Sequence, residues 1–416
     1  MTLITNISKL YGVDTGGVSR RSGSLMQQPS CLCDAWLLTG DDGRVKDYGL
    51  MTAVPGLPED DMLDAQGGIV LPAFCDSHTH LVYAGSRHGE FEDKIRGLSY
   101  EEIAARGGGI LNSADLLHDT TENELFSQSA RRLVEVIAKG TGAIEIKSGY
   151  GLTVADELKM LRVIARLADS FPVDVRATFL GAHAVGRAFA GRQQEYVDHI
   201  IADMLPAVAA EGLADYVDVF CDRGFFTVDQ TDAILTAACR YGLKPKIHAN
   251  ELDCSGGVQV GVAHHALSVD HLERIGEPEI GLLASSDTVA TMLPGASFFL
   301  GMPYAPARRA VDAGVTVALA SDYNPGSSPS GDMRFVWALG CIKMRLTPVE
   351  ALHAVTINGA AAMGLGDSHG SLDRGRIANL LVTRPLDDLA RIPYQYNTPW
   401  LRSRFHHGRL VDTYSF

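Results

Sequence analysis

The 416-residue sequence lacks the features of a secreted or membrane-spanning protein. No apolar run approaches the length needed to cross a bilayer. The N-terminal MTLITNISKLYGV has no basic segment followed by an apolar stretch, so it does not resemble a signal peptide. The seven cysteines form an odd set without a CxxC pair, and the isolated Cys31-x-Cys33 pair is best explained as two reduced thiols rather than a soft metal site. We expect a soluble, cytoplasmic protein.

The chain also lacks an excess of positive charge. Its net charge of −14 argues against nucleic acid or anionic membranes as partners, because both require a positive protein surface. A small anionic substrate is compatible with this net charge, because one arginine beside the substrate acts on it more strongly than negative charges spread over the distant surface. The sequence leaves a homodimer open.

What is present from residue 68 onward is an alternation of short apolar runs with helical stretches, which is typical of parallel βα units. The length suits one barrel of roughly 250–300 residues with a satellite domain. The fold class predicted is therefore α/β, a (β/α)8 TIM-type barrel. Eight strands are expected, at residues 69–76, 142–148, 175–183, 216–222, 245–250, 267–273, 288–294 and 315–322.

Both ends of the chain have a different pattern of short strands and turns. Asp41-Asp42-Gly43 marks a hairpin, and strand-like segments return after about residue 360. We expect one small composite β domain formed by both termini. The predicted divisions are 1–66 and 361–416 for its two parts, and 67–360 for the barrel. Helices are expected at 122–140, 153–170, 194–212 and 228–242.

Metal-binding residue types occur at the ends of the predicted strands. His78 and His80 are two residues apart, so both point to one face of an extended strand. His248 ends the fifth strand and Asp322 the eighth. Catalytic groups of such barrels gather at these strand ends. We therefore predict a metal site of His78, His80, His248 and Asp322; unrelated core or surface histidines are the alternative.

Two further residues are candidates for chemistry beside that metal. Glu251, three residues after His248, could move a proton between water and a substrate nitrogen. His271, at the end of the sixth strand, could stabilise an oxyanion or orient the water. Together with Asp322 they form the predicted catalytic group. For Glu251, the alternative role is that of a carboxylate at the start of a helix.

The ligand types favour one zinc or iron ion and do not decide between the two metals. A two-metal site would need a bridging carboxylate or a modified lysine at the fourth strand. That strand ends Phe220-Cys221-Asp222-Arg223 and offers no lysine.

Six ordered segments are similar to the imidazolonepropionase family of the amidohydrolase superfamily. They are HTHLVYAGSRHGEF (78–91), RGGGI (106–110), EIKSGYGL (145–152), TFLGAHAV (178–185), HANEL (248–252) and SDYNPGSSP (321–329). The resemblance covers nearly the whole chain. It implies hydrolysis of the cyclic amide of 4-imidazolone-5-propanoate to N-formimidoyl-L-glutamate in histidine degradation, with one zinc or iron ion.

The resemblance also implies roles for individual residues. Arg87 matches the residue that takes the propanoate carboxylate, as a guanidinium can do with two hydrogen bonds; otherwise it is a surface arginine paired with Glu90. The remaining substrate-binding residues implied are Tyr150, His183, Glu251, Asn324, Gly326 and Ser327. For the Asn324 segment, the alternative is simply a favourable turn.

Two other functions fit parts of the pattern. A one-metal deaminase of cyclic amidines shares the histidine pair, the HxxE spacing and the final aspartate, but gives no reason for a carboxylate clamp at Arg87. A metal-stabilised scaffold protein would need neither Glu251 nor His271. The glycines at 107–109 lack a following Lys-Ser/Thr, so a mobile loop is favoured over a phosphate cradle.

Overall fold

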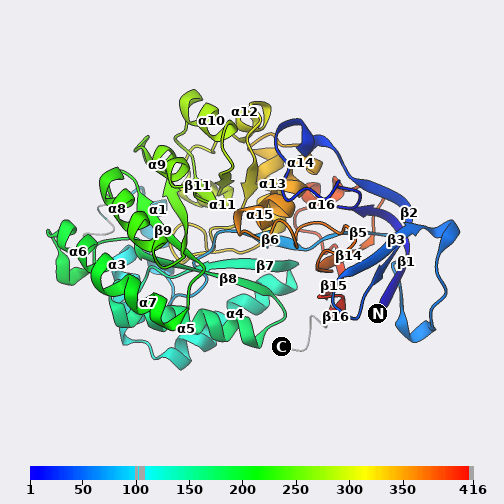
Figure 1. Cartoon of the computed structure of the whole chain (residues 1–416), viewed down its shortest axis with the longest axis horizontal. Coiled ribbons are helices and arrows are strands. Elements are labelled where there is room, and N and C mark those ends of the chain that lie inside the picture. Colours follow the sequence, from blue (N-terminus) through cyan, green and yellow to red (C-terminus); the bar gives the residue numbers. More distant parts are fainter. Residues whose placement is uncertain (99–101, 103–107, 412–416) are drawn as a thin grey trace.

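The computed structural model describes residues 1–98, 102 and 108–411. Its larger sheet is parallel and runs in the order β13-β12-β11-β10-β9-β8-β7-β6. An isolated parallel bridge between Thr79 and Tyr323 joins the segments that follow the first and last of these strands. Figure 1 shows helices around the outside. The (β/α)8 fold is therefore confirmed. The strands are β6 (Phe74–Asp76), β7 (Thr141–Lys147), β8 (Asp174–Ala182), β9 (Tyr216–Cys221), β10 (Lys244–Ala249), β11 (Ser268–His271), β12 (Val289–Met292) and β13 (Val317–Leu319).

The helices begin at residues suited to capping them. Thr153 precedes α5 and accepts a hydrogen bond from the Asp156 backbone, while Thr227 and Gln230 form a capping box at α8. The helices are α1 (His88–Ile95), α3 (Ile110–Asp119), α4 (Glu122–Ala138), α5 (Val154–Ser170), α6 (Gln193–His199), α7 (Leu205–Glu211), α8 (Val228–Cys239), α9 (Gly257–Ala263), α10 (Glu277–Ala284), α11 (Pro294–Leu300), α12 (Ala307–Asp312), α13 (Met333–Ile342), α14 (Pro348–Val355), α15 (Ile357–Ala362) and α16 (Arg391–Tyr394).

One expected helix is interrupted. The stretch 194–212 forms α6, a π-helical turn at Ile200–Met204 and α7, instead of one regular α-helix. The wider turn accommodates Pro206 just after its end, where a proline lacks the N–H that a regular helix would use.

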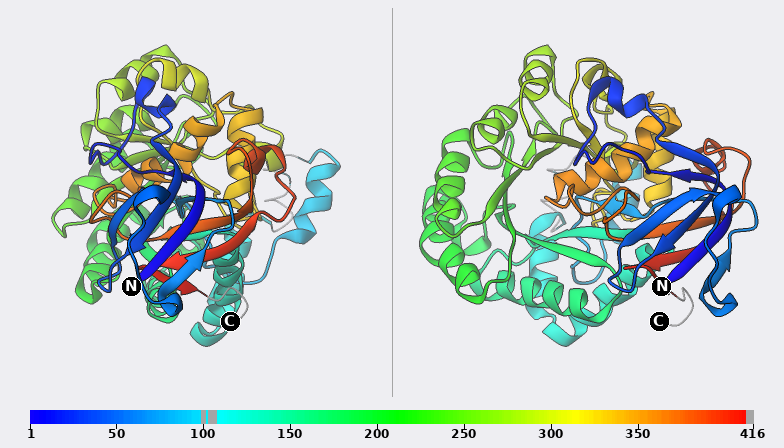
Figure 2. Two further views of the ribbon diagram at one scale, coloured as in Figure 1. Left: turned by 90° about the vertical axis from the view of Figure 1, so that its right-hand side faces the viewer. Right: turned by 45° about the vertical axis from the view of Figure 1, so that its right-hand side comes forward.

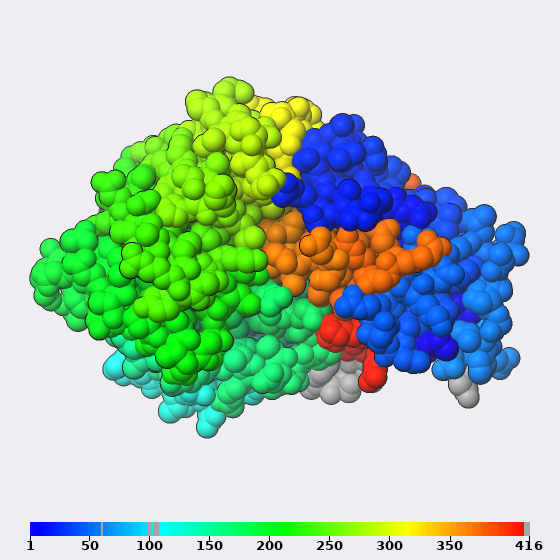
Figure 3. All heavy atoms as spheres, in the orientation of Figure 1, coloured from blue at the N-terminus to red at the C-terminus, as the bar shows by residue number. Residues whose placement is uncertain are grey.

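The second sheet is built from both ends of the chain, as expected. Its order is β16-β15-β14-β5-β1-β2-β3, with β4 beside β1, so C-terminal strands pair directly with an N-terminal one. Figures 2 and 3 show the blue N-terminal segments beside the orange and red C-terminal ones. The strands are β1 (Thr2–Tyr11), β2 (Cys31–Thr39), β3 (Val45–Leu50), β4 (Met62–Asp64), β5 (Gly68–Pro72), β14 (Leu380–Pro385), β15 (Leu401–His406) and β16 (Arg409–Val411).

The prediction of a single strand at residues 69–76 is wrong in one respect. It divides at Ala73 into β5, which pairs with β14 of the composite sheet, and β6, which begins the barrel. All eight residues from Ile69 to Asp76 are buried. A fully buried run gives no alternation of polar and apolar residues, so the sequence pattern could not reveal the change of sheet.

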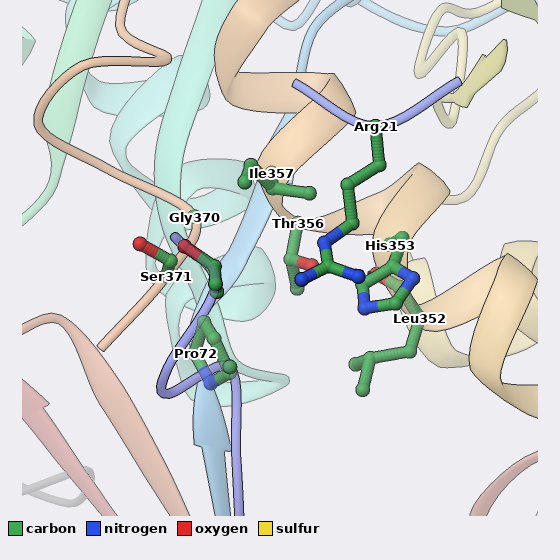
Figure 4. Close-up of a pocket in the computed structure, with 10 residues that line it drawn as sticks. Arg21, Pro72, Leu352, His353, Thr356, Ile357, Gly370 and Ser371 are labelled. Atoms are coloured by element: carbon green, nitrogen blue, oxygen red, sulfur yellow. Dashed lines mark hydrogen bonds between the residues drawn. The ribbon is translucent and has the colours of Figure 1, made fainter. Parts of the chain in front are cut away.

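Arg21 connects the N-terminal segment to the barrel through hydrogen bonds. Its backbone N–H donates to Asn358 Oδ1, and its guanidinium donates to the carbonyls of Leu25 and Gln28. Figure 4 shows its guanidinium beside the ring of His353, at a cavity of about 10 Å³. That volume suits about one water molecule. The cavity belongs to the seam between the two sheets and contains none of the predicted site residues.

Among the helices of the described residues, none is both long and apolar enough to span a lipid bilayer. All seven cysteines lie in the described part and carry free thiols. Cys31 and Cys33 lie on β2, and burial raises the pKa of Cys31 to about 11.

Candidate active site

The closure of the barrel brings the first and eighth strands into a fixed register. The Asp322 N–H donates to the carbonyl of His78 over 3.0 Å, and the His80 N–H donates to the carbonyl of Tyr323 over 2.9 Å. Asp322 has φ +54°, a left-handed conformation that is uncommon for a residue other than glycine. These backbone contacts hold the His78–His80 pair beside Asp322, although 244 positions separate His78 from Asp322.

The four predicted ligands converge in the structure. Asp322 Oδ1 lies 3.6 Å from His78 Nε2 and 3.7 Å from His80 Nε2. His248 Nε2 lies 3.3 Å from His80 Nε2. All four side chains are buried. Their ligand atoms therefore surround one small volume at the carboxyl ends of the strands.

The donor set fits a divalent cation. His78 Nε2 is buried and has no hydrogen-bond partner among the described residues. Burial lowers the pKa of His78 and of His80 well below the usual value, so both rings are neutral and offer a lone pair at neutral pH. Burial also raises the pKa of Asp322, an effect that a bound cation would oppose. Three imidazoles and one carboxylate form a typical zinc or iron ligand set.

Beneath these histidines lies a buried ionic layer that the sequence reasoning missed. Lys147 Nζ contacts Glu145 Oε1 at 2.6 Å, Asp218 Oδ2 at 2.8 Å and Asp270 Oδ2 at 3.5 Å. Lys246 pairs with the other oxygen of Glu145. All five side chains are fully buried. Burial lowers the pKa of Lys147, but the three carboxylates raise it by more, so Lys147 keeps its positive charge.

This layer fixes two of the predicted ligands. Asp270 Oδ2 lies 2.7 Å from His78 Nδ1, and Asp218 Oδ2 lies 2.9 Å from His248 Nδ1. A carboxylate at one ring nitrogen orients the histidine and leaves the other nitrogen for a metal. Two ammonium groups and three carboxylates give the layer a net charge of −1, which favours a cation directly above it.

Replacing Asp270 by asparagine is expected to weaken cation binding by about 10- to 100-fold, because His78 loses its charged partner. Competition with a chelator measures the affinity, and circular dichroism checks the fold. Asp232→Asn is the matched control, since Asp232 faces His264 at 2.8 Å in an exposed pair. An unchanged affinity in Asp270→Asn would contradict the positioning role of Asp270.

Glu251 and His271 lie side by side next to the four ligands. Their facing atoms, Glu251 Oε2 and His271 Nε2, are 3.6 Å apart. Burial raises the pKa of Glu251 to about 7, and the carboxylates of Glu251 and Glu273 raise the pKa of His271 despite its burial. Glu251 does not begin a helix, because α9 starts only at Gly257. A proton can therefore be exchanged at Glu251 near neutral pH.

A single carboxylate shapes the loop that carries Glu251. Asp222, just after β9, accepts hydrogen bonds from the backbone N–H groups of Glu251, Leu252 and Asp253 at 2.8 to 3.1 Å. Both Asn250, at φ +56°, and His271, at φ +83°, have left-handed backbones. Such conformations persist only where surrounding contacts enforce them and are concentrated at functional sites.

Arg87 is buried against the loop that follows β13. Its Nε and Nη2 donate to the Glu90 carboxylate at 2.7 to 3.0 Å. The ion pair with Glu90 that the sequence suggested is therefore present, but it is buried and does not lie on the surface. An added Cβ on Gly326 would lie 2.2 Å from Arg87 Nη1. Lys94, which the sequence reasoning missed, hydrogen-bonds to the Gly326 carbonyl. Burial lowers the pKa of Lys94 to about 8.

Tyr150 and His183 form an aromatic wall beside the ligands. The His183 ring stacks on His80 with centroids 5.1 Å apart, and Tyr150 lies 5.3 Å from His183. His183 Nδ1 is 3.0 Å from the Gly149 carbonyl, and burial lowers the pKa of His183 to about 3. His183 is therefore neutral and donates from Nδ1, which leaves Nε2 as an acceptor.

The turn after Asp322 is held by its own polar groups. Asn324 Oδ1 accepts the N–H groups of Gly326 and Ser327, both at 2.7 Å. Ser327 Oγ donates to Asp322 Oδ2 over 3.1 Å, which leaves Oδ1 toward the histidines. Asn324 thus supports the turn, and its contact with substrate stays a prediction. In the predicted segment RGGGI, residues 106 and 107 lie outside the described residues.

Comparison with known proteins agrees with this architecture. The model of the amidohydrolase family matches residues 69–400. The imidazolonepropionase of Christiangramia forsetii is 50% identical over 98% of this chain and 99% of that protein, and that of Flavobacterium johnsoniae is 50% identical over 99% and 100%. The fold resembles atrazine chlorohydrolase from Arthrobacter aurescens TC1 complexed with zinc, with a TM-score of 0.75, 16% identity and coverage of 99% and 95%. The chain therefore belongs to the amidohydrolase family and, within it, to the imidazolonepropionases.

Proposed function

We propose that this chain hydrolyses the ring amide of 4-imidazolone-5-propanoate with one zinc or iron ion. Water adds to the ring carbonyl carbon, the carbon–nitrogen bond breaks, and the nitrogen receives a proton, giving N-formimidoyl-L-glutamate. The observation that carries the proposal is the convergence of three imidazoles and the Asp322 carboxylate directly beside Glu251. The two relatives that are 50% identical to this chain are named imidazolonepropionase, which supports the choice of substrate.

The metal would be held by His78, His80, His248 and Asp322. When bound, a divalent cation lowers the pKa of water and polarises a carbonyl oxygen. Glu251 accepts the proton of the attacking water and delivers it to the departing nitrogen, a task for which a pKa near 7 is well matched. His271, with its raised pKa, holds Glu251 in place and donates to the oxygen that gains negative charge.

Arg87 and its neighbours supply the substrate's carboxylate site. Glu90 fixes one edge of the guanidinium through its Nε and Nη2. Lys94 adds a second positive charge on the same side of Gly326. The rings of Tyr150 and the neutral His183, tilted by 52° to one another, offer aromatic faces to a planar five-membered ring. A substrate with a ring amide at one end and a carboxylate at the other matches this arrangement.

Incubation with freshly made imidazolone propanoate tests the proposal directly. Loss of the ring absorbance with one product per substrate is expected, and it should stop on metal removal and return on metal addition. Cytosine and guanine should not be deaminated. Release of ammonia from either base, without turnover of the imidazolone, would favour a cyclic-amidine deaminase instead. No turnover of any of these compounds by metal-loaded protein would overturn the enzyme assignment.

Gly326→Ala is expected to raise KM by about 10- to 100-fold with little loss of stability. The new methyl group would push the flexible end of Arg87 aside, since the clash distance is only 2.2 Å. Gly281→Ala is the control, because an added Cβ there meets nothing within 4 Å. Adding Gly326→Ala to Arg87→Met should cost little more than Arg87→Met alone; fully additive losses would show that Gly326 acts independently of Arg87.

A further inference from the structure

A second group of histidines lies at the opposite end of the barrel from the catalytic residues. Asp174 is the first residue of β8, whereas His183 follows its last residue. The two positions are roughly 30 Å apart along the strand. His406 ends β15 and His407 begins the turn to β16. The group therefore joins the N-terminal end of a barrel strand to the composite sheet.

The ligand atoms of three of these residues converge. His407 Nε2 lies 2.9 Å from Asp174 Oδ1, and His406 Nδ1 lies 3.9 Å from Asp174 Oδ2. One potential ligand atom from each of Asp174, His406 and His407 lies within 4.8 Å of the others. In a tetrahedral site with bonds of about 2.0–2.1 Å, ligand atoms are roughly 3.3 Å apart. The observed spacing therefore requires only small movements to enclose an ion.

One ring nitrogen in this group is left without a partner. His406 Nδ1 is a buried atom and has no hydrogen bond within the part of the chain that the structure describes. Such a nitrogen normally has a protein, water or metal partner, because leaving it unsatisfied costs free energy. It faces the Asp174 carboxylate at 3.9 Å, so a cation held by that carboxylate would give the nitrogen a partner.

The carboxylate is held in place as metal-binding carboxylates usually are. Asn379 donates from Nδ2 to Asp174 Oδ2 over 2.6 Å and accepts the His407 N–H at 2.9 Å. His369 Nε2 lies 3.0 Å from the same carboxylate oxygen, and its Nδ1 lies 2.7 Å from Ser368 Oγ. The Asn379 side chain thus fixes both the Asp174 carboxylate and the backbone of His407.

We propose that Asp174, His406 and His407 form a second divalent-cation site, separate from the catalytic one and structural in purpose. Imidazole and carboxylate ligands suit zinc and its neighbours in the first transition row. His407 is partly exposed, so a water molecule can complete the coordination. A bound ion would fasten the C-terminal strands to the barrel and stabilise the folded chain. The proposal does not depend on the identity of the substrate.

Zinc titration of the enzyme carrying its catalytic cation tests the site. Wild-type protein whose catalytic site already holds zinc is expected to reach a total of two zinc ions per chain, with a rise in Tm as the second ion binds. A His406→Gln/His407→Gln variant should stop at one equivalent, lose the rise in Tm and keep its turnover. His199→Gln, which alters an aspartate-paired histidine elsewhere, should still bind two.

Two results would overturn the proposal. Wild-type protein that binds only one equivalent would show that the group is a hydrogen-bonded clamp without a metal. A double variant that still binds two equivalents would place the second ion elsewhere. If the double variant fails to fold, anomalous diffraction from zinc-soaked wild-type crystals decides, since the site requires a peak beside Asp174.

Discussion

Glu251→Gln is expected to lower kcat by about 10²- to 10⁴-fold while the cation stays bound. Glutamine keeps the size of the side chain but cannot accept the proton of the attacking water. Glu251 is not among the four predicted ligands, so metal content should remain at the wild-type value. Steady-state turnover of the imidazolone, measured on samples of known metal content, gives the result.

Asp253→Asn is the matched control for this experiment. Asp253 lies two residues further along the same loop, has a half-exposed side chain, and pairs with Arg223 at 3.0 Å. Its loss should leave turnover nearly unchanged. Wild-type turnover by a metal-loaded Glu251→Gln protein would remove Glu251 from the mechanism, whereas equal losses in both variants would indicate a disturbed loop.

Arg87→Met is expected to reduce kcat/KM by about 30-fold to several thousand-fold, mainly through KM, because removing one partner of a buried charge pair costs about 2–5 kcal/mol. The loss should be much smaller for a substrate analogue that lacks the propanoate carboxylate. Comparing both substrates separates the clamp from general damage to the site. Initial rates over a range of concentrations provide KM and kcat.

Arg187→Met provides the control for Arg87. Arg187 binds Asp115 through its Nε and Nη2, as Arg87 binds Glu90, but its side chain is about half exposed. KM should not change in this variant. An unchanged KM in Arg87→Met, or an equal loss with the analogue, would show that Arg87 does not recognise the carboxylate.

The predicted metal ligands could be found from sequence because parallel barrel strands end on the same side. His78, His80, His248 and Asp322 each lie at such an end, and the structure brings them together. The two-part sheet was also predictable from the strand-like pattern at both termini. These inferences needed only the type of residue and its place in a repeating βα pattern.

The ionic layer beneath the histidines was not predicted, although a signal existed. Lys147, Asp218 and Asp270 are charged residues within strands whose residues are all buried, and buried charges require partners. The sequence shows that partners are needed but not which strands supply them. That pairing depends on the side chains meeting inside the closed barrel.

Lys94 was missed for a different reason. It follows Arg87 by seven residues, two helical turns, and so lies on the same side of α1 as Arg87 and Glu90. An exposed ion pair along a helix is the usual explanation for such spacing. Only the contact with Gly326, 232 positions away, indicates a place in the site.

Anomalous diffraction from crystals grown with zinc tests the central claim most directly. Besides the peak proposed at Asp174, a strong peak is expected at the carboxyl ends of the barrel strands, about 2.0–2.2 Å from His78 Nε2, His80 Nε2, His248 Nε2 and an Asp322 carboxylate oxygen. Absence of a peak among these four side chains in catalytically active crystals would contradict the account.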